Sequence, residues 1–241
     1  MSGTPCRLRS LFLVCCAALL LCRPEAQATE RTLHILTSTF PLYQITRNIT
    51  LGVNGVEVEL MIPAQMGCPH DYALTPQDMR KLARTDVLII NGLGMEEFLG
   101  APVRKANPNL TLIDSSHGIK QVLPSTKTAE DEHDHAPKTH GHEAYRDAHG
   151  ANPHLFASPR MAALLATNIA NALAEFHPAG AAVYTGNGQA YSQRLNRLAD
   201  EMAALGKRLD NNRRVTQHGV FDYLARDMGL VVVAVVQAHA G

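Results

Sequence analysis

Residues 87–91 read VLIIN, a run in which four apolar side chains precede an asparagine. A short run that is apolar at every position is typical of a strand buried on both faces of a parallel sheet. Upstream of it, Thr75 followed by Pro76 marks the start of a helix that we expect to extend to Arg84. The stretch therefore predicts a helix followed by a central strand, which is the repeating unit of an α/β fold.

The same alternation of strand and helix continues along the first half of the chain. Short apolar runs predict strands, and segments with helical spacing of apolar residues lie between them. The predicted strands are 33–38, 56–62, 87–91 and 110–114, and the predicted helices are 40–50, 75–84 and 96–106. We therefore expect an α/β fold in which helices flank both sides of a parallel sheet.

Two longer helical patterns follow, over residues 158–176 and 179–209. The second contains Gly186 and Gly188, and a glycine inside a helix costs about 1 kcal/mol relative to alanine. That helix must therefore be stabilised by packing, or it breaks at the glycines. A strand at 214–217, a helix at 220–228 and a strand at 230–236 complete the predicted elements.

The N-terminus has the features of an export signal. Arg7 and Arg9 precede an apolar run at 11–21, and the small-residue site Ala26-Gln27-Ala28 follows. The run is shorter than the roughly 20 residues of a membrane-spanning helix, although a retained anchor is the alternative. We expect residues 1–28 to be a signal peptide that directs the protein to the periplasm.

Removal of this signal changes the number of cysteines. Only Cys68 of the five cysteines lies outside residues 1–28, so the exported chain has no disulfide framework. Attachment of a lipid at Cys22 would anchor the protein to a membrane. Leu21 is larger than the residue that normally precedes a lipidated cysteine, so we expect a mature chain that begins near Thr29.

Histidine is the unusual residue in this composition. The chain has 12 histidines against 6 phenylalanines, 6 tyrosines and no tryptophan, which favours metal or proton chemistry. Basic and acidic residues number 22 each. The net charge of zero argues against a nucleic-acid partner, because such proteins carry a basic excess on one face.

Many of these histidines lie in one polar segment, residues 124–150, where hydrophobic periodicity disappears. We expect this segment to be a disordered loop that binds metal weakly. The alternative is a solvated linker whose histidines are incidental. The histidines in question are His133, His135, His140, His142 and His149.

Three further histidines occupy equivalent places in the predicted layout. His70 follows the second strand, His154 precedes a helix, and His218 directly follows the strand at 214–217. Ligands of open α/β sheets bind at the carboxyl ends of strands, so the three histidines together favour a metal site. Each one alone is more often a capping or surface residue. His117, which follows the fourth strand, is the best substitute ligand.

The segment GCPHDYALTPQDMRKLARTDVLIINGLGMEEFL, residues 67–99, resembles the first metal-ligand region of the substrate-binding proteins of zinc and manganese ABC importers. ANPHLFASPR and VTQHGVFDYLARDMGL resemble the second and third ligand segments of that family. The resemblance covers essentially the whole mature chain. It implies two α/β lobes joined by one long helix, with the metal bound in the cleft by His70, His154 and His218.

The resemblance also gives the expected domain boundaries. We expect an N-terminal α/β lobe over 29–177, a linking helix over 178–209 and a C-terminal lobe over 210–241. The last lobe has few elements, and the strand at 231–236 is apolar throughout with little to cover it. We therefore expect the intact protein to continue past Gly241.

The donor set predicts the metal. Three imidazoles suit tetrahedral Zn²⁺, whereas Mn²⁺ prefers more oxygen ligands and is less favoured. The fourth ligand stays open between water, Cys68 and a residue that this chain lacks. Together with this donor set, the resemblance implies a monomer that captures Zn²⁺ in the periplasm with high affinity and delivers it to an ABC permease in the inner membrane.

Two other functions fit part of the same pattern. Three histidines and a water also form the metal centre of zinc hydrolases. Against an enzyme, the chain has no HExxH motif, and Glu96 and Glu97 look like ordinary charges near a helix start. A zinc store or adhesin at the cell surface, which would use the loop more than the cleft, is the third possibility, and a lipidated Cys22 would favour it.

Overall fold

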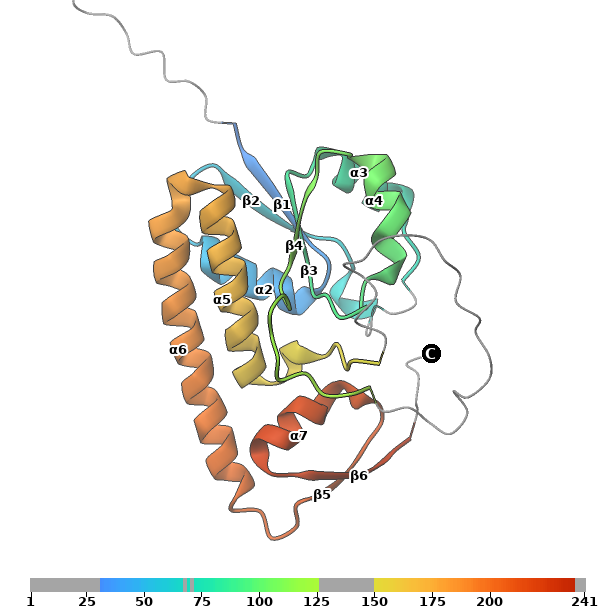
Figure 1. The fold of residues 1–241 in the computed structure, drawn as a ribbon, viewed down its shortest axis with the longest axis vertical. Helices are drawn as coiled ribbons and strands as arrows, with labels where there is room; N and C mark the ends of the chain where they lie inside the picture. Colours follow the sequence, from blue (N-terminus) through green and yellow to red (C-terminus); the bar gives the residue numbers. More distant parts are fainter. Residues whose placement is uncertain (1–30, 67–68, 70–71, 126–149, 237–241) are drawn as a thin grey trace, which may run out of the picture. The chain divides into compact units, whose positions relative to one another are not determined.

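The computed structural model describes residues 31–66, 69, 72–125 and 150–236, and Figure 1 shows its elements. The chain divides into two compact units, Met1–Arg31 and Thr32–Gly241, and the elements described here belong to the second. The expected signal peptide lies outside the described residues. None of the described helices has the length and apolar character needed to cross a bilayer.

The main sheet has four parallel strands. They are β1 (Leu33–Thr37), β2 (Val56–Leu60), β3 (Val87–Ile90) and β4 (Thr111–Asp114), in the order β2-β1-β3-β4. The order reverses direction between β1 and β3, so the carboxyl ends of these two strands flank the switch point where open α/β sheets bind their ligands.

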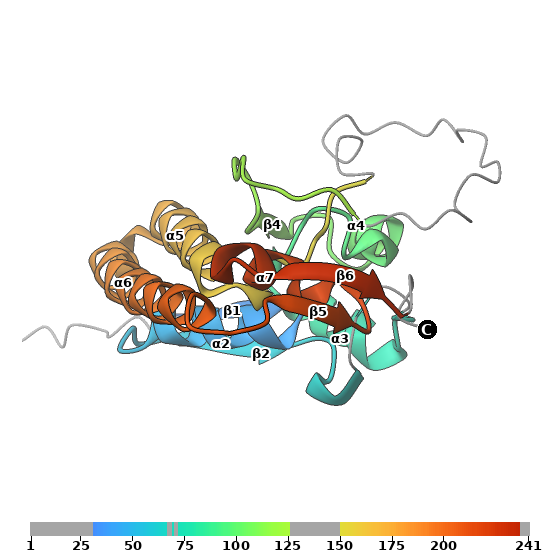
Figure 2. The same ribbon diagram turned by 90° about the horizontal axis from the view of Figure 1, so that it is seen from below.

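Helices cover both faces of this sheet (Figures 1 and 2). On one side are α2 (Phe40–Thr50), α5 (Pro159–Phe176) and α6 (Ala181–Gly206), and on the other are α3 (Pro76–Arg84) and α4 (Gly100–Ala106). The predicted fold class is therefore confirmed. The described strand and helix ends mostly lie within two residues of the predicted ones.

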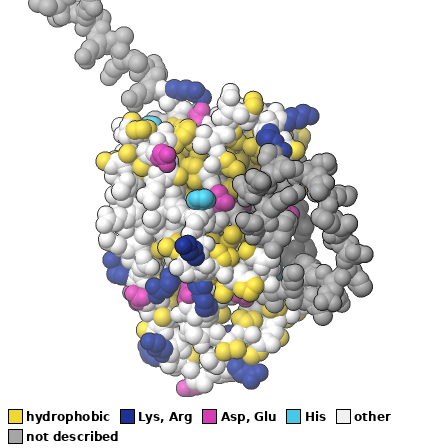
Figure 3. Space-filling model, viewed as in Figure 1, with side chains coloured by type: hydrophobic (Ala, Val, Ile, Leu, Met, Phe, Trp, Pro, Cys, Tyr) yellow, Lys and Arg dark blue, Asp and Glu magenta, His cyan; other side chains and the backbone are white. Residues whose placement is uncertain are grey.

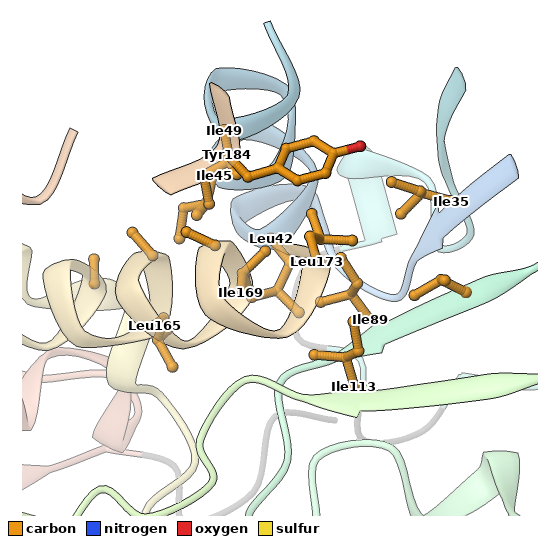
Figure 4. Packing of buried hydrophobic residues seen from close by; sticks show 14 of the residues in the cluster. Ile35, Leu42, Ile45, Ile49, Ile89, Ile113, Leu165, Ile169, Leu173 and Tyr184 are labelled. Carbon is orange, nitrogen blue, oxygen red and sulfur yellow. The ribbon is translucent and has the colours of Figure 1, made fainter. Parts of the chain in front are cut away.

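The run that predicted the central strand is buried as expected. All four side chains of β3 are at most 2% exposed. Val87 and Ile89 pack into the larger core with α2 and α5, while Leu88 and Ile90 pack into the smaller core with Leu82 of α3. Figure 4 shows Ile89 between the sheet and the side chains of α2 and α5.

The helix predicted over 96–106 is shorter than expected. The segment Glu97–Leu99 forms a 3-10 turn, and the α-helix begins only at Gly100. Glu96, directly before this turn, is 1% exposed, and its side chain accepts hydrogen bonds from groups at the ends of β1 and β3. The prediction that Glu96 is an ordinary charge near a helix start is therefore wrong.

The long helix α6 continues through both of its glycines. An added Cβ at Gly188 would lie 2.4 Å from the Cβ of Ala170 in α5, so this glycine permits the two helices to pack closely. Gly186 has no atom within 4 Å of such a Cβ. Packing against α5 therefore stabilises the helix, which is one of the two outcomes the sequence left open.

These two glycines give a matched pair of variants. We expect G188A to lower the free energy of unfolding by about 1–3 kcal/mol, because its methyl group overlaps Ala170. We expect G186A to raise it by up to about 1 kcal/mol, because an exposed helical glycine is replaced without a clash. Urea unfolding followed by circular dichroism measures both. Equal effects of the two substitutions would contradict the packing argument.

A second sheet consists of two parallel strands, β5 (Arg213–Thr216) and β6 (Val231–Val235), with α7 (Asp222–Met228) between them in sequence. The apolar strand β6 is partly uncovered, with Val231 50% and Val233 42% exposed. Hydrophobic side chains reach the surface in the lower part of Figure 3, where Figure 1 places this strand pair. Whether residues 210–241 form a separate lobe stays a prediction.

Candidate metal site

The first predicted ligand, His70, lies outside the described residues, as does Cys68. The segment that follows them is anchored by the buried carboxylate of Asp78, which accepts hydrogen bonds from the Tyr72 hydroxyl at 2.8 Å and from the backbone N–H of Thr75 at 2.8 Å. Burial, together with the bond to this carboxylate and its charge, raises the pKa of Tyr72 to about 12. Tyr72 is therefore a neutral hydrogen-bond donor at physiological pH.

His154 is buried, with 3% of its surface exposed, in a short segment before the 3-10 turn Leu155–Ala157. The Oδ1 atom of Asn152 lies 2.8 Å from its Nδ1 atom and accepts a hydrogen bond from its backbone N–H at 3.0 Å. Asn91, directly after β3, donates from its side chain to the carbonyl of Pro153 at 2.8 Å. His154 is thus held at the carboxyl end of the central strand.

His218 follows β5 and precedes the 3-10 turn Gly219–Phe221 that leads into α7. Its ring lies against that of His154 in a T-shaped arrangement, with centroids 4.8 Å apart and planes at 87°. Two imidazoles bound to one tetrahedral Zn²⁺ place their ring centroids about 5 Å apart, given Zn–N bonds of about 2.0–2.1 Å. The separation fits a shared metal and is also normal for a T-shaped ring contact.

Several hydrogen bonds connect the segments that carry these two histidines. The side-chain nitrogen of Asn152 donates to the carbonyl of Gly219 at 2.8 Å and to Oδ2 of Asp222 at 3.0 Å. The hydroxyl of Tyr223, which is buried in α7, donates to the carbonyl of Asn152 at 2.6 Å and accepts from the N–H of Leu123 at 3.0 Å. Residues far apart in sequence are therefore fixed together beside the histidine pair.

Glu96 lies at the switch point of the main sheet. Its carboxylate accepts hydrogen bonds from the Ser38 hydroxyl at 2.6 Å, the N–H of Asn91 at 2.8 Å and the N–H of Gly92 at 3.1 Å. Burial raises its pKa from 4.5 to about 7; the three hydrogen bonds oppose this rise, and the charge of Asp114 adds to it. All three donors come from the ends of β1 and β3, so the carboxylate joins these two strand ends.

Gly92 permits the chain to turn back so that Glu96 reaches this position. Its φ is +83°, a left-handed conformation that favours glycine. An added Cβ would lie 2.1 Å from Oδ1 of Asp114. The glycine after the central strand is therefore required both by its backbone conformation and by its close approach to β4.

His117 is the other candidate histidine among the described residues, and the structure does not bring it to this pair. His117 is exposed in the turn after β4 and lines a small hollow with Lys120 and Leu164. The loop histidines His133, His135, His140, His142 and His149 lie outside the described residues. Within the described ranges, no group of three or more His, Cys, Asp or Glu side chains is arranged to hold a metal ion. The two paired histidines would need further ligands, and the predicted third is His70.

Sequence reasoning did not identify two residues of this region. Asn152 appears in the sequence only as part of the Asn-Pro-His motif. The groups to which its side-chain nitrogen donates belong to Gly219 and Asp222, about seventy positions away. Glu96 looks in the sequence like a helix-start charge. The glycines at 92 and 94 beside it indicate an irregular turn, and that pattern argues against a regular helix at this position.

Comparison with known protein families gives one match that covers most of the chain. The family model for ZnuA, described as zinc-uptake complex component A, periplasmic, matches residues 35–241. This range contains the main sheet, the long helices and the segments of both paired histidines.

Curated and solved relatives agree with this match. The zinc-binding lipoprotein AdcA of Streptococcus pneumoniae is 28% identical over 222 residues, which are 92% of this chain and 42% of that protein. The high-affinity zinc uptake system protein ZnuA of Bacillus subtilis is 26% identical over 212 residues, 88% of this chain and 63% of that protein. The crystal structure of a zinc-bound ZnuA deletion mutant has a TM-score of 0.68 at 28% identity, covering 85% of this chain and 69% of that one. The chain thus spans less than two thirds of the length of both curated relatives.

Proposed function

Because this chain belongs to the ZnuA family of periplasmic zinc-uptake components, we propose that it captures Zn²⁺ and delivers it to an ABC permease in the inner membrane. The observation that carries the proposal is the contact between His154 and His218, whose ring centroids are 4.8 Å apart although the residues come from separate segments. Curated relatives named as zinc-binding and zinc-uptake proteins support the same function.

The proposed metal site uses His154, His218 and His70 as protein ligands. The His154 and His218 segments are fixed by hydrogen bonds with the side chains of Asn91 and Asn152, so these segments lose little conformational entropy when a metal binds. A set of three imidazoles favours Zn²⁺ over Mn²⁺. The fourth position is proposed to be water, Cys68 or a residue beyond this chain.

The protein is proposed to transport zinc and to catalyse no reaction. The buried carboxylate of Glu96 accepts three hydrogen bonds from the ends of two strands. We therefore assign it a structural role, and not the role of the general base of a zinc hydrolase. A screen for hydrolysis of peptide, ester and phosphate substrates tests this point. Zinc-dependent turnover would favour the hydrolase.

We propose that the protein is a periplasmic monomer with a cleaved signal peptide at residues 1–28, an N-terminal lobe at 29–177, a linking helix at 178–209 and a C-terminal lobe at 210–241. Mass spectrometry of the mature N-terminus distinguishes the two export routes. A mature chain that begins at Thr29 supports the soluble form. A lipidated Cys22 would instead support a surface-anchored zinc store or adhesin.

The central experiment is a zinc titration of metal-free protein against a chelator of known affinity, together with metal analysis of protein purified without added metal. We expect one tight zinc equivalent from the histidine site and weaker equivalents from the loop. Deletion of residues 130–149 should remove only the weak equivalents. A segment that must become ordered to bind a metal loses conformational entropy, so its histidines bind the metal less tightly.

The described residues on both sides of this segment make the deletion feasible. The N–H of Ser125 donates to the carbonyl of Gly150 at 2.6 Å, and the N–H of Asn152 donates to the carbonyl of Leu123 at 2.8 Å. Residues 126–129 would then close a hairpin loop of ordinary length. Loss of the tight equivalent on deletion would place the primary site within residues 130–149.

A further inference from the structure

The orientation of the Asn152 amide follows from the groups around its nitrogen. Nδ2 lies 2.8 Å from the carbonyl oxygen of Gly219 and 3.0 Å from Oδ2 of Asp222. A carbonyl and a carboxylate only accept hydrogen bonds. The NH₂ group of the amide must therefore face them, and Oδ1 must face His154.

This orientation in turn determines which nitrogen of His154 carries the proton. Oδ1 of Asn152 is an acceptor, and it already accepts the backbone N–H of His154 at 3.0 Å. The Nδ1 atom of His154, which lies 2.8 Å from the same oxygen, must then be the donor. In the neutral ring Nε2 keeps its lone pair, and a lone pair on Nε2 is what a metal ion needs from an imidazole.

The same side chain fixes the segment of the second histidine. Gly219, whose carbonyl Asn152 binds, directly follows His218, and Asp222 opens the helix that comes next. Asn152 is 2% exposed, so water competes little for these bonds. The buried amide of Asn152 thus contacts both histidine-bearing segments: its oxygen accepts hydrogen bonds from His154, and its nitrogen donates to the segment that follows His218.

We propose that Asn152 is a positioning residue for zinc: its oxygen holds His154 in the Nδ1–H tautomer, and its nitrogen holds the segment of His218 against that ring. This inference rests on the proposed function, in which the two histidines bind Zn²⁺. Partners of ligating histidines that act in this way contribute about 10–100-fold to metal affinity.

The test compares three variants with one control. N152A removes both halves of the interaction and should weaken zinc binding by about 10–100-fold. N152D keeps an acceptor for His154 but places a second carboxylate oxygen against Asp222 and the Gly219 carbonyl, so it should also bind zinc less tightly than the wild type. In the double variant N152D/D222N the amide introduced at position 222 can donate to the carboxylate introduced at position 152. We expect its affinity to recover by at least about threefold relative to N152D.

Asn168 provides the matched control. Its side-chain nitrogen also donates to two backbone carbonyls, those of Ser115 and His117, at 2.9 Å each. N168A therefore removes a similar pair of hydrogen bonds without touching either histidine-bearing segment, and it should bind zinc like the wild type. An equal loss in N168A would mean that the effect of N152A reflects general destabilisation.

A second measurement does not depend on zinc at all. Nitrogen-15 NMR of the histidine rings in zinc-free protein at alkaline pH reports the tautomer of His154. We expect the Nδ1–H form in the wild type and in N152D, and loss of that preference in N152A. An Nε2–H ring in the wild type, or N152A with unchanged tautomer and unchanged affinity, would overturn the inference. Absence of tight zinc binding by the wild type would instead overturn the proposed function.

Discussion

Replacing His154 or His218 by alanine is expected to weaken the tight zinc equivalent by about tenfold or more. Removal of one of three protein ligands costs at least about 1.4 kcal/mol, which is one decade in affinity. The two rings are in contact at 4.8 Å between centroids, so each variant should affect the same equivalent. His70→Ala should have a similar effect, because His70 is the proposed third ligand. Isothermal titration calorimetry or competition with a chelator measures the loss.

His34 is the control for these variants. It lies near the start of β1, at the opposite end of the strands from the proposed site, and its ring contacts Glu57 at 3.2 Å. H34A should bind zinc like the wild type. The assignment of the site would be wrong if H154A and H218A retained the affinity of the parent, or if H34A lost as much affinity as they did.

The second large effect concerns Glu96. Its replacement by alanine should lower the free energy of unfolding by about 3 kcal/mol or more at pH 5. Three donors, the Ser38 hydroxyl and the N–H groups of Asn91 and Gly92, would lose their acceptor. Each buried donor without a partner costs about 1–3 kcal/mol. Urea unfolding gives the change, and Glu97, an exposed neighbour, supplies the control variant E97A.

The pH dependence of stability gives an independent measurement on the same group. Burial raises the pKa of Glu96 from 4.5 to about 7 in the folded protein, so between these values the folded state binds more protons than the unfolded state. The contribution of Glu96 is therefore fully present below pH 4.5 and is lost as pH rises to about 7. The size of this change is about 3 kcal/mol.

E96Q removes this titration and keeps a similar shape. The unfolding free energy of the wild type minus that of E96Q should therefore fall as the pH rises from 4.5 to 7, and it should become constant above pH 7. A difference that stays constant across the range would show that Glu96 keeps its ordinary acidity in the folded protein.

The sequence patterns predicted those parts of the fold that depend on neighbouring residues. The apolar run at Val87–Ile90 is buried on both faces, and Thr75 forms the expected helix cap, accepting a hydrogen bond from the N–H of Asp78. Apolar periodicity and capping are local properties. Both are therefore readable from one short segment of the chain.

The parts that the sequence missed or left open depend on contacts between distant segments. Whether α6 continues through Gly188 depends on Ala170 in another helix, and the burial of Glu96 depends on the meeting of two strand ends. The role of Asn152 depends on Gly219 and Asp222. At the candidate site, the sequence predicted the two histidines that meet but did not predict the amide that contacts both of their segments.

The backbone is paired at the two ends of the histidine-rich segment. Ser125 and Gly150 are hydrogen-bonded to each other, and an antiparallel bridge joins Pro124 to Ala151. Once the ends of a connection are fixed, doubling its length costs only about 0.6 kcal/mol of closure entropy. Insertions and deletions between these ends are therefore nearly neutral for folding. The number of histidines carried there can therefore change while the fold stays the same.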